Sequence, residues 1–320
     1  MVNATTPGPQ TGLRFRAFAP GGIGNIGPGL DILGCALTGP GDSVEARIEG
    51  AAGVWIEDPG HSALPRDAQR HTSGLAALEV LRLASRSDVG ITLRIEKGLP
   101  LAGGQGGSAA SAVAGAVATN AVLGNPLDNP TLIRAALAAE ERVAGKHADN
   151  VVPCLLGGIV LIRRVEPLEF TRIPTPAWLR IALVRPDMTL STKSARSILP
   201  KAVDRATALA QAAAVSSMIA AFCLGDPSLL RGAVDDRIAE PAREHLIPGF
   251  RRVKRAALDA GALGCSISGA GPSMFALADS DIAAQAAMRA MLSAFESNGV
   301  RAEGRVASID ERGARLVQAQ

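Results

Sequence analysis

Aromatic residues and cysteines are scarce in this sequence. Only 3% of its 320 residues are aromatic and none is tyrosine, so Ala, Val, Ile and Leu must fill the core. Few rings are left to stack on nucleic-acid bases. The four cysteines lie far apart and form no C-x-x-C pair, so neither a disulfide framework nor a zinc site is indicated. We therefore expect a reducing, cytoplasmic setting.

A dominant charge, a leader segment and a strongly apolar run are also missing. With 33 basic and 30 acidic residues the net charge is +3, which argues against a nucleic-acid partner. The N-terminus has no basic stretch followed by an apolar core, so neither a secretory signal nor a transit peptide is predicted. The longest apolar run, 206–224, is alanine-rich and contains Gln and Ser. It predicts a buried helix rather than a membrane partner.

Common catalytic motifs are missing as well. The four histidines lack metal-ligand spacing, and Gly145-Lys146 is followed by His147 instead of the Ser or Thr of a Walker A loop. Gly22, Gly24 and Gly27 match the G-x-G-x-x-G spacing of dinucleotide-binding proteins. A helix should begin inside that motif, yet residues 28–29 are Pro-Gly. The segment is therefore either a turn-rich loop between strands or a loop that directs Asn25 and Asp31 toward a small polar ligand, with an NAD-dependent dehydrogenase as the alternative.

The clearest signal is a glycine-rich stretch before an alanine-rich run. Four of the five residues in 103–107 are glycine, and Ser108 follows them. Glycine lets backbone amides converge on a ligand, and a helix start favours an anion. The segment therefore predicts a phosphate-binding loop, with the Ser108 hydroxyl available to Mg²⁺. A tight turn before a helix is the alternative.

Three weaker patterns follow. The polar segment 147–150 (His-Ala-Asp-Asn) precedes a buried-looking run and needs partners there. Arg196 and Arg243 could each pair with a carboxylate or phosphate, although a single arginine is more often a surface residue. The glycine-rich turn 264–273 is either a hairpin or a loop close to a ligand.

Strand and helix patterns alternate without a regular βαβ rhythm, which predicts an α+β fold. Strands are expected at 13–19, 44–48, 54–56, 89–95, 159–163, 179–184 and 305–309, and on either side of a turn within 266–277. Helices are expected at 71–83, 108–123, 130–143, 204–223, 227–238, 249–260 and 282–298. Residues 1–12 are expected to form a loose tail. The proline-rich segment 167–177 indicates the junction between two domains, which are expected at 13–170 and 171–320.

In this order, the motifs resemble those of the GHMP kinases. The resemblance is carried by the early loop 25–31, the glycine-rich loop 100–111 and the S-G-x-G-P turn 268–272. Within that superfamily, 25–31, 147–150, 191–196 and 240–250 resemble the homoserine kinases. The resemblance implies an N-terminal nucleotide-binding α+β domain and a C-terminal ferredoxin-like α+β domain. It also implies a homodimer that uses ATP and Mg²⁺ to convert L-homoserine to O-phospho-L-homoserine for threonine biosynthesis.

The resemblance also assigns roles to individual residues. ATP would be held by Pro100, Gly103, Gly104, Gly106, Gly107, Ser108, Ala109 and Ser111. Mg²⁺ would be held by Ser108 and Glu140. Homoserine would be held by Asn25, Asp31, Asn150, Arg196, Arg243, Ser268 and Gly269, with the arginines facing its carboxylate and Asp31 its ammonium group. The catalytic positions near the attacking hydroxyl would be Asn150 and Thr192.

The chain departs from the family pattern at two positions of the glycine-rich loop. Gln105 replaces a leucine, and Gly107 replaces the first serine of a Ser-Ser pair, which removes one hydroxyl. Asn150 occupies the place where many GHMP kinases have an aspartate base, and an amide does not accept a proton at ordinary pH. We therefore expect direct in-line transfer without a side-chain base. A GHMP kinase for another small alcohol and a non-catalytic nucleotide-binding protein are the alternatives.

Overall fold

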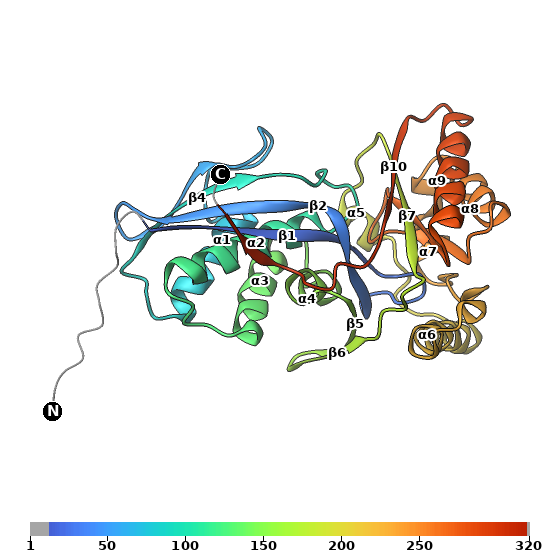
Figure 1. The fold of residues 1–320 in the computed structure, drawn as a ribbon, viewed down its shortest axis with the longest axis horizontal. Helices are drawn as coiled ribbons and strands as arrows, with labels where there is room; N and C mark the ends of the chain where they lie inside the picture. The colour runs from blue at the N-terminus through green and yellow to red at the C-terminus, as the bar shows by residue number, and fades with distance from the viewer. Residues whose placement is uncertain (1–12, 319–320) are drawn as a thin grey trace.

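The computed structural model describes residues 13–318, so the predicted tail at 1–12 lies outside the described residues. Within that range the chain builds two β-sheets. The strands of the first are β1 (Arg14–Gly24), β2 (Leu33–Ile48), β3 (Gly53–Asp58), β4 (Gly90–Glu96), β5 (Ile159–Val165), β6 (Leu168–Ile173) and β11 (Arg315–Val317). The main path of this sheet is β11-β1-β2-β4-β3, and β5 joins the end of β2 and pairs with β6 (Figure 1).

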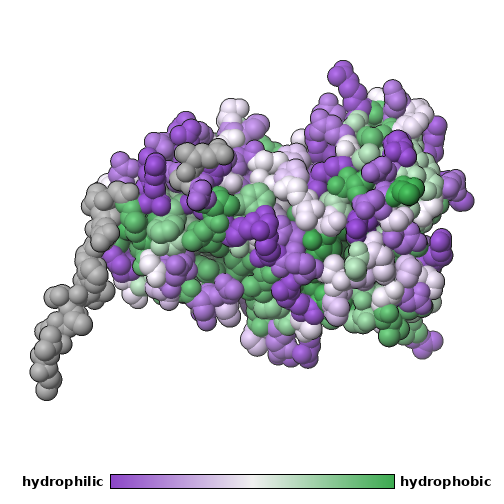
Figure 2. Space-filling view, in the orientation of Figure 1, coloured by the Kyte–Doolittle hydropathy of each residue, from purple (hydrophilic) through white to green (hydrophobic). Residues whose placement is uncertain are grey.

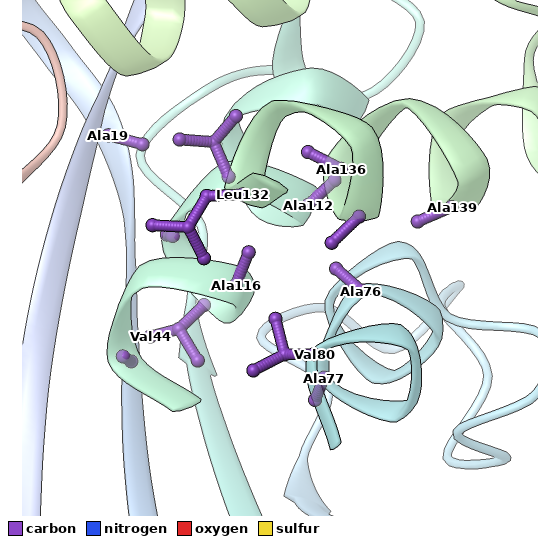
Figure 3. Close-up of a cluster of buried hydrophobic side chains, with 14 of the residues drawn as sticks. Ala19, Val44, Ala76, Ala77, Val80, Ala112, Ala116, Leu132, Ala136 and Ala139 are labelled. Carbon is purple, nitrogen blue, oxygen red and sulfur yellow. The ribbon is translucent and has the colours of Figure 1, made fainter. Parts of the chain in front are cut away.

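Four helices pack together against this sheet. They are α1 (Thr72–Leu83), α2 (Gly107–Val122), α3 (Asn129–Val143) and α4 (Ala148–Leu156). Figure 3 shows the cluster where α1, α2 and α3 meet the sheet, and the labelled side chains are alanine, valine and leucine. Alanine side chains let helices approach closely, and the side chains labelled there fill this part of the core without aromatic rings.

The second sheet has the ferredoxin-like strand order. It contains β7 (Arg180–Pro186), β8 (Gly264–Ile267), β9 (Met274–Ala278) and β10 (Ala302–Ala307), in the order β10-β7-β9-β8 with antiparallel pairs. The helices α8 (Phe250–Asp259) and α9 (Asp281–Glu296) cover one face. The other face joins a cluster that also includes residues from β2 and β5 of the first sheet. The predicted α+β class and the ferredoxin-like arrangement of the C-terminal sheet are confirmed.

The sheets do not divide the chain at a single point. The boundary predicted at 170–171 falls inside β6, and β11 from the C-terminal end pairs with β1 of the first sheet. The structure also contains α4, where the sequence suggested only an apolar run, and β2 begins at Leu33 instead of 44. Residues 227–230 form one 3-10 turn instead of the helix predicted over 227–238.

Helix α6 (Arg205–Leu224) corrects the expectation of a buried helix. Met218 and Phe222 pack into the cluster between the sheets, but Leu209 and Leu224 are 64% and 74% exposed. Figure 2 shows pale and green residues at the lower right, where Figure 1 places α6. Among the described residues, α6 alone is long and apolar enough to span a membrane by length and composition, with a mean hydropathy of 1.7. Alanine gives the helix its apolar character, but only one face has packing partners.

Candidate active site

The predicted phosphate-binding loop joins β4 to the start of α2. Gly104 and Gly106 have φ values of +72° and +69°, a conformation that favours glycine. Gly106 is also the N-cap of α2, and no side chain caps the helix. The first amides of this 16-residue helix are therefore available to an anion, and the helix dipole favours negative charge there.

Hydroxyl groups from the C-terminal domain hold this loop in place. Ser268 Oγ donates to the Gly104 carbonyl and Ser273 Oγ to the Gly103 carbonyl, each at 2.6 Å. A Cβ on Gly104 would lie 2.5 Å from the Ser268 carbonyl oxygen, so glycine is required where the two segments meet. The Ser268 hydroxyl hydrogen is thus used by the loop, and its substrate contact stays a prediction.

A cavity of about 460 Å³ lies between this loop and the C-terminal domain. Most of the residues predicted for the site line it, including Asn25, Pro100, Gly103, Gly104, Gly106, Gly107, Ser108, Ser111, Glu140, Asn150, Thr192, Arg196, Arg243 and Gly269. Asp31, Ala109 and Ser268 do not line it. Ala109 is buried in the first turn of α2. The fold thus brings together segments that lie more than 200 residues apart in sequence.

Glu140 and Ser108 form a polar pair beside the loop. Ser108 Oγ donates to Glu140 Oε1 at 2.5 Å, while the buried Oε2 atom has no hydrogen-bond partner among the described residues. Burial is the main reason that the pKa of Glu140 is raised to about 7, although the Ser108 hydrogen bond opposes the shift. A free carboxylate oxygen next to a hydroxyl is a ligand set that suits a hard cation, so these residues fit Mg²⁺.

Lys97 is a cavity residue that the sequence analysis missed. Its Nζ atom donates to the Gly107 carbonyl at 3.0 Å and to Ser111 Oγ at 2.9 Å, and it pairs with the fully buried Asp42 carboxylate. Ser111 Oγ in turn donates to Asp42 Oδ2 at 2.6 Å. The Ser111 hydroxyl is therefore held within this network at the cavity wall, and its contact with ATP stays a prediction. A lysine just after the predicted strand 89–95, on the way to the glycine-rich stretch, was the available signal.

At the other end of the cavity, residues predicted to bind the substrate contact one another. Asn25 Oδ1 accepts a hydrogen bond from the Asp31 amide at 2.7 Å. Arg196 Nη1 donates to Asp31 Oδ2 at 3.1 Å, and the second guanidinium nitrogen pairs with the other carboxylate oxygen. Arg196 and Thr192 lie on α5 (Thr192–Ser197), whose N-cap is Ser191. Asp31 and Arg196, predicted to hold opposite ends of an amino acid, form an ion pair in this structure.

Arg243 ends α7 (Ala239–Arg243) and is only 3% exposed. Its Nε atom donates to the Ala195 carbonyl at 3.0 Å and its Nη1 atom to the Gly269 carbonyl at 3.1 Å. Burial lowers the pKa of this guanidinium. The two hydrogen bonds hold the cation in place between α5 and the glycine-rich turn.

Comparison with known proteins identifies this arrangement. Residues 73–158 match the GHMP kinases N terminal domain, and residues 218–297 match the GHMP kinases C terminal domain. Homoserine kinases from Chlorobaculum tepidum and Arabidopsis thaliana are 40% and 39% identical over 94% of this chain, covering 97% and 84% of those proteins. A homoserine kinase from Cytophaga hutchinsonii, 40% identical, has a TM-score of 0.92 and covers 98% of this chain and 100% of its own. The chain belongs to the homoserine kinase family.

The wider GHMP kinase fold is also present in more distant proteins. A mevalonate kinase from L. major has a TM-score of 0.67 at 17% identity, which shows a shared fold.

The structure also shows what the early G-x-G-x-x-G glycines of this homoserine kinase family member form. Gly22 and Gly24 belong to β1, and the chain turns back into β2 without a helix. The dinucleotide-binding alternative is therefore wrong.

Two further polar residues of this homoserine kinase family member, His147 and Asp149, lie in or behind the cavity wall. His147 lines it, and its Nδ1 atom lies 3.3 Å from Arg196 Nη2. Burial and the nearby Arg196 charge lower the pKa of His147, which favours the neutral ring. Asp149 is 1% exposed, and burial, with help from the Asp31 charge, raises its pKa to about 7. The polar segment 147–150 was the sequence signal, but it did not assign roles to these two residues.

Proposed function

We propose that this protein transfers the γ-phosphoryl group of ATP to the side-chain hydroxyl of L-homoserine, giving O-phospho-L-homoserine for threonine biosynthesis. The observation that carries the proposal is the cavity itself. At one end lie the free amides of the glycine-rich loop and the Ser108–Glu140 pair, and at the other lie Arg196 and Arg243, with Asp31 paired to Arg196 beside the cavity. The homoserine kinases at about 40% identity support the same activity.

The loop residues 103–108 would bind the triphosphate through backbone amides. Ser108 and Glu140 would hold Mg²⁺, which supplies charge neutralisation on the phosphate oxygens. Lys97 supports the start of α2 at the same end, since its Nζ atom donates to the Gly107 carbonyl at 3.0 Å.

The two arginines would bind the homoserine carboxylate, and Asp31 its ammonium group. An amino acid carries both charges, so it can replace each partner of the Asp31–Arg196 ion pair with one of its own groups. This exchange favours a zwitterion over mevalonate, which has no ammonium group, or a neutral sugar. Arg243 keeps its place through the Ala195 and Gly269 carbonyls while the pair opens.

In the reaction, the substrate hydroxyl oxygen bonds to the γ-phosphorus while the bond to the β–γ bridging oxygen breaks and ADP leaves. Asn150 and Thr192 line the cavity, and neither side chain takes up a proton at neutral pH. We therefore infer that these residues orient the hydroxyl, whose proton passes to a phosphate oxygen. Alignment and charge neutralisation carry the catalysis.

A substrate panel tests this proposal. ADP release is measured with ATP and Mg²⁺ over homoserine, mevalonate, galactose and shikimate, with an EDTA control. We expect turnover with homoserine that EDTA abolishes. Turnover with another alcohol alone would indicate a different GHMP kinase, and ATP binding without turnover would indicate a non-catalytic protein. The homodimer and the cytoplasmic location rest on the resemblance and composition, and sedimentation would test the first.

A further inference from the structure

Asp149 is a buried carboxylate that contacts the site without lining the cavity. It lies in the first turn of α4. Its Oδ2 atom accepts a hydrogen bond from the Asn25 amide at 2.9 Å, and its Oδ1 atom lies 3.5 Å from Asn150 Nδ2. Asp149 therefore contacts both asparagines that line the cavity, from behind the cavity wall.

These contacts determine which end of the Asn150 amide enters the cavity. In its ionised form Asp149 only accepts hydrogen bonds, so the amide turns its NH₂ group toward this carboxylate. The Oδ1 atom then points the other way, and it lies 3.2 Å from the position that a Cβ on Gly106 would occupy. Two glycines make room for this orientation, because a Cβ on Gly24 would lie 2.4 Å from Asn150 Nδ2.

The orientation matters because the proposed reaction needs an acceptor at this point. A hydroxyl that donates a hydrogen bond to Asn150 Oδ1 keeps its lone pairs free for the γ-phosphorus. The proton stays on the hydroxyl oxygen during this alignment and passes to a phosphate oxygen as the new P–O bond forms. A reversed amide would instead donate to the hydroxyl oxygen and occupy a lone pair that must attack.

We propose that Asp149 is a positioning residue for phosphoryl transfer, which holds the Asn150 carboxamide with Oδ1 toward the phosphate-binding loop so that Oδ1 accepts a hydrogen bond from the substrate hydroxyl. This inference rests on the proposed function. It adds a residue that acts through Asn150, and it explains why a buried acid stands beside an amide where this chain has no side-chain base.

The test is Asp149→Asn, compared with the unmodified enzyme in the homoserine and ATP assay. The substituted side chain still offers an oxygen to the Asn25 amide, but its NH₂ group now faces Asn150 and favours the reversed orientation. We expect kcat to fall about 10- to 100-fold, while both KM values change by less than about threefold. In the double variant Asp149→Asn/Asn150→Asp, the carboxylate at position 150 offers an acceptor oxygen in either orientation, so most of the lost kcat should return.

A double-mutant cycle with Asn150→Ala separates positioning from a merely structural role. If Asp149 acts through Asn150, Asp149→Asn costs nothing further once Asn150 is alanine. The proposal would be overturned if the two losses of kcat multiply in the double variant. It would also be overturned if Asp149→Asn leaves kcat unchanged, or if it raises KM for homoserine at normal kcat. If Asp149→Asn does not fold, Gly24→Ala displaces the same amide and must lower kcat, and normal kcat there would overturn it. Absence of turnover in the unmodified enzyme would refute the proposed function instead.

Discussion

Replacing Glu140 by glutamine should remove activity and change how stability depends on pH. Glu140 is 2% exposed, and one carboxylate oxygen has no partner among the described residues. Without the metal, folding must bury this group either as a neutral acid or as a poorly solvated anion. At high pH the ionised Glu140 therefore destabilises the metal-free protein. The proposed Mg²⁺ would explain why a carboxyl group stands at this buried position.

The magnitude follows from the pKa. Burial raises the pKa of Glu140 from its ordinary 4.5 to about 7, so between these pH values the folded state holds a proton that the unfolded state has released. The free energy of unfolding therefore falls as pH rises through this window and is constant above it. The full difference corresponds to about 3 kcal/mol, and from pH 5 to pH 8.5 we expect about 2–3 kcal/mol.

Urea unfolding in EDTA at pH 5 and pH 8.5 measures this effect in the unmodified protein and in Glu140→Gln. The unmodified protein should lose about 2–3 kcal/mol more than the variant across that range. Asp149 also has a raised pKa, but it is present in both proteins, so its contribution cancels to first order. The matched control is Glu141→Gln on the same helix, because the Glu141 side chain is 57% exposed. Its pH dependence should follow that of the unmodified protein.

Equal pH dependence in Glu140→Gln and the unmodified protein would refute this reasoning, since it would mean that burial does not hold a proton on Glu140. The same variant should lose about 100-fold or more of its activity with Mg²⁺ and ATP, because the amide replaces a charged metal ligand. Activity that survives the substitution would contradict the proposed Mg²⁺ role.

Two further substitutions test the ends of the cavity. Arg243→Lys should raise KM for homoserine about 10- to 100-fold in steady-state kinetics, because lysine cannot bind a carboxylate with two donors while serving the Ala195 and Gly269 carbonyls. An unchanged KM would remove Arg243 from the substrate site. Ser273→Ala leaves the Gly103 carbonyl without its 2.6 Å donor, so it should lower stability by about 1–2 kcal/mol in urea unfolding and raise KM for ATP. Unaltered ATP kinetics would show that the loop holds its shape alone.

Local chemistry made several features predictable from the sequence. The glycines of 103–107 and the alanine-rich run after Ser108 determine a loop followed by a helix start, because few other residues allow that backbone. The motif resemblance correctly predicted two α+β domains of GHMP type, and most residues it assigned to the site line one cavity. The family comparisons support the same activity.

Long-range contacts could not be read from the sequence. Helix α4 forms although its apolar run contains Pro153, and β11 returns to β1 from the far end of the chain. Lys97 acquires its place only when Asp42, 55 residues away in sequence, is buried beside it.

By itself, the sequence determined the glycine-rich loop with the helix that follows it and the residue types available to the site, because glycine and alanine restrict the backbone within a few residues. Tertiary structure decided which of those side chains are free to act. It bound the Ser268 and Ser111 hydroxyls to other groups, paired Asp31 with Arg196, and left one Glu140 oxygen without a partner among the residues described. Those outcomes depend on burial and on contacts between distant segments, which exist only once the two sheets have packed together.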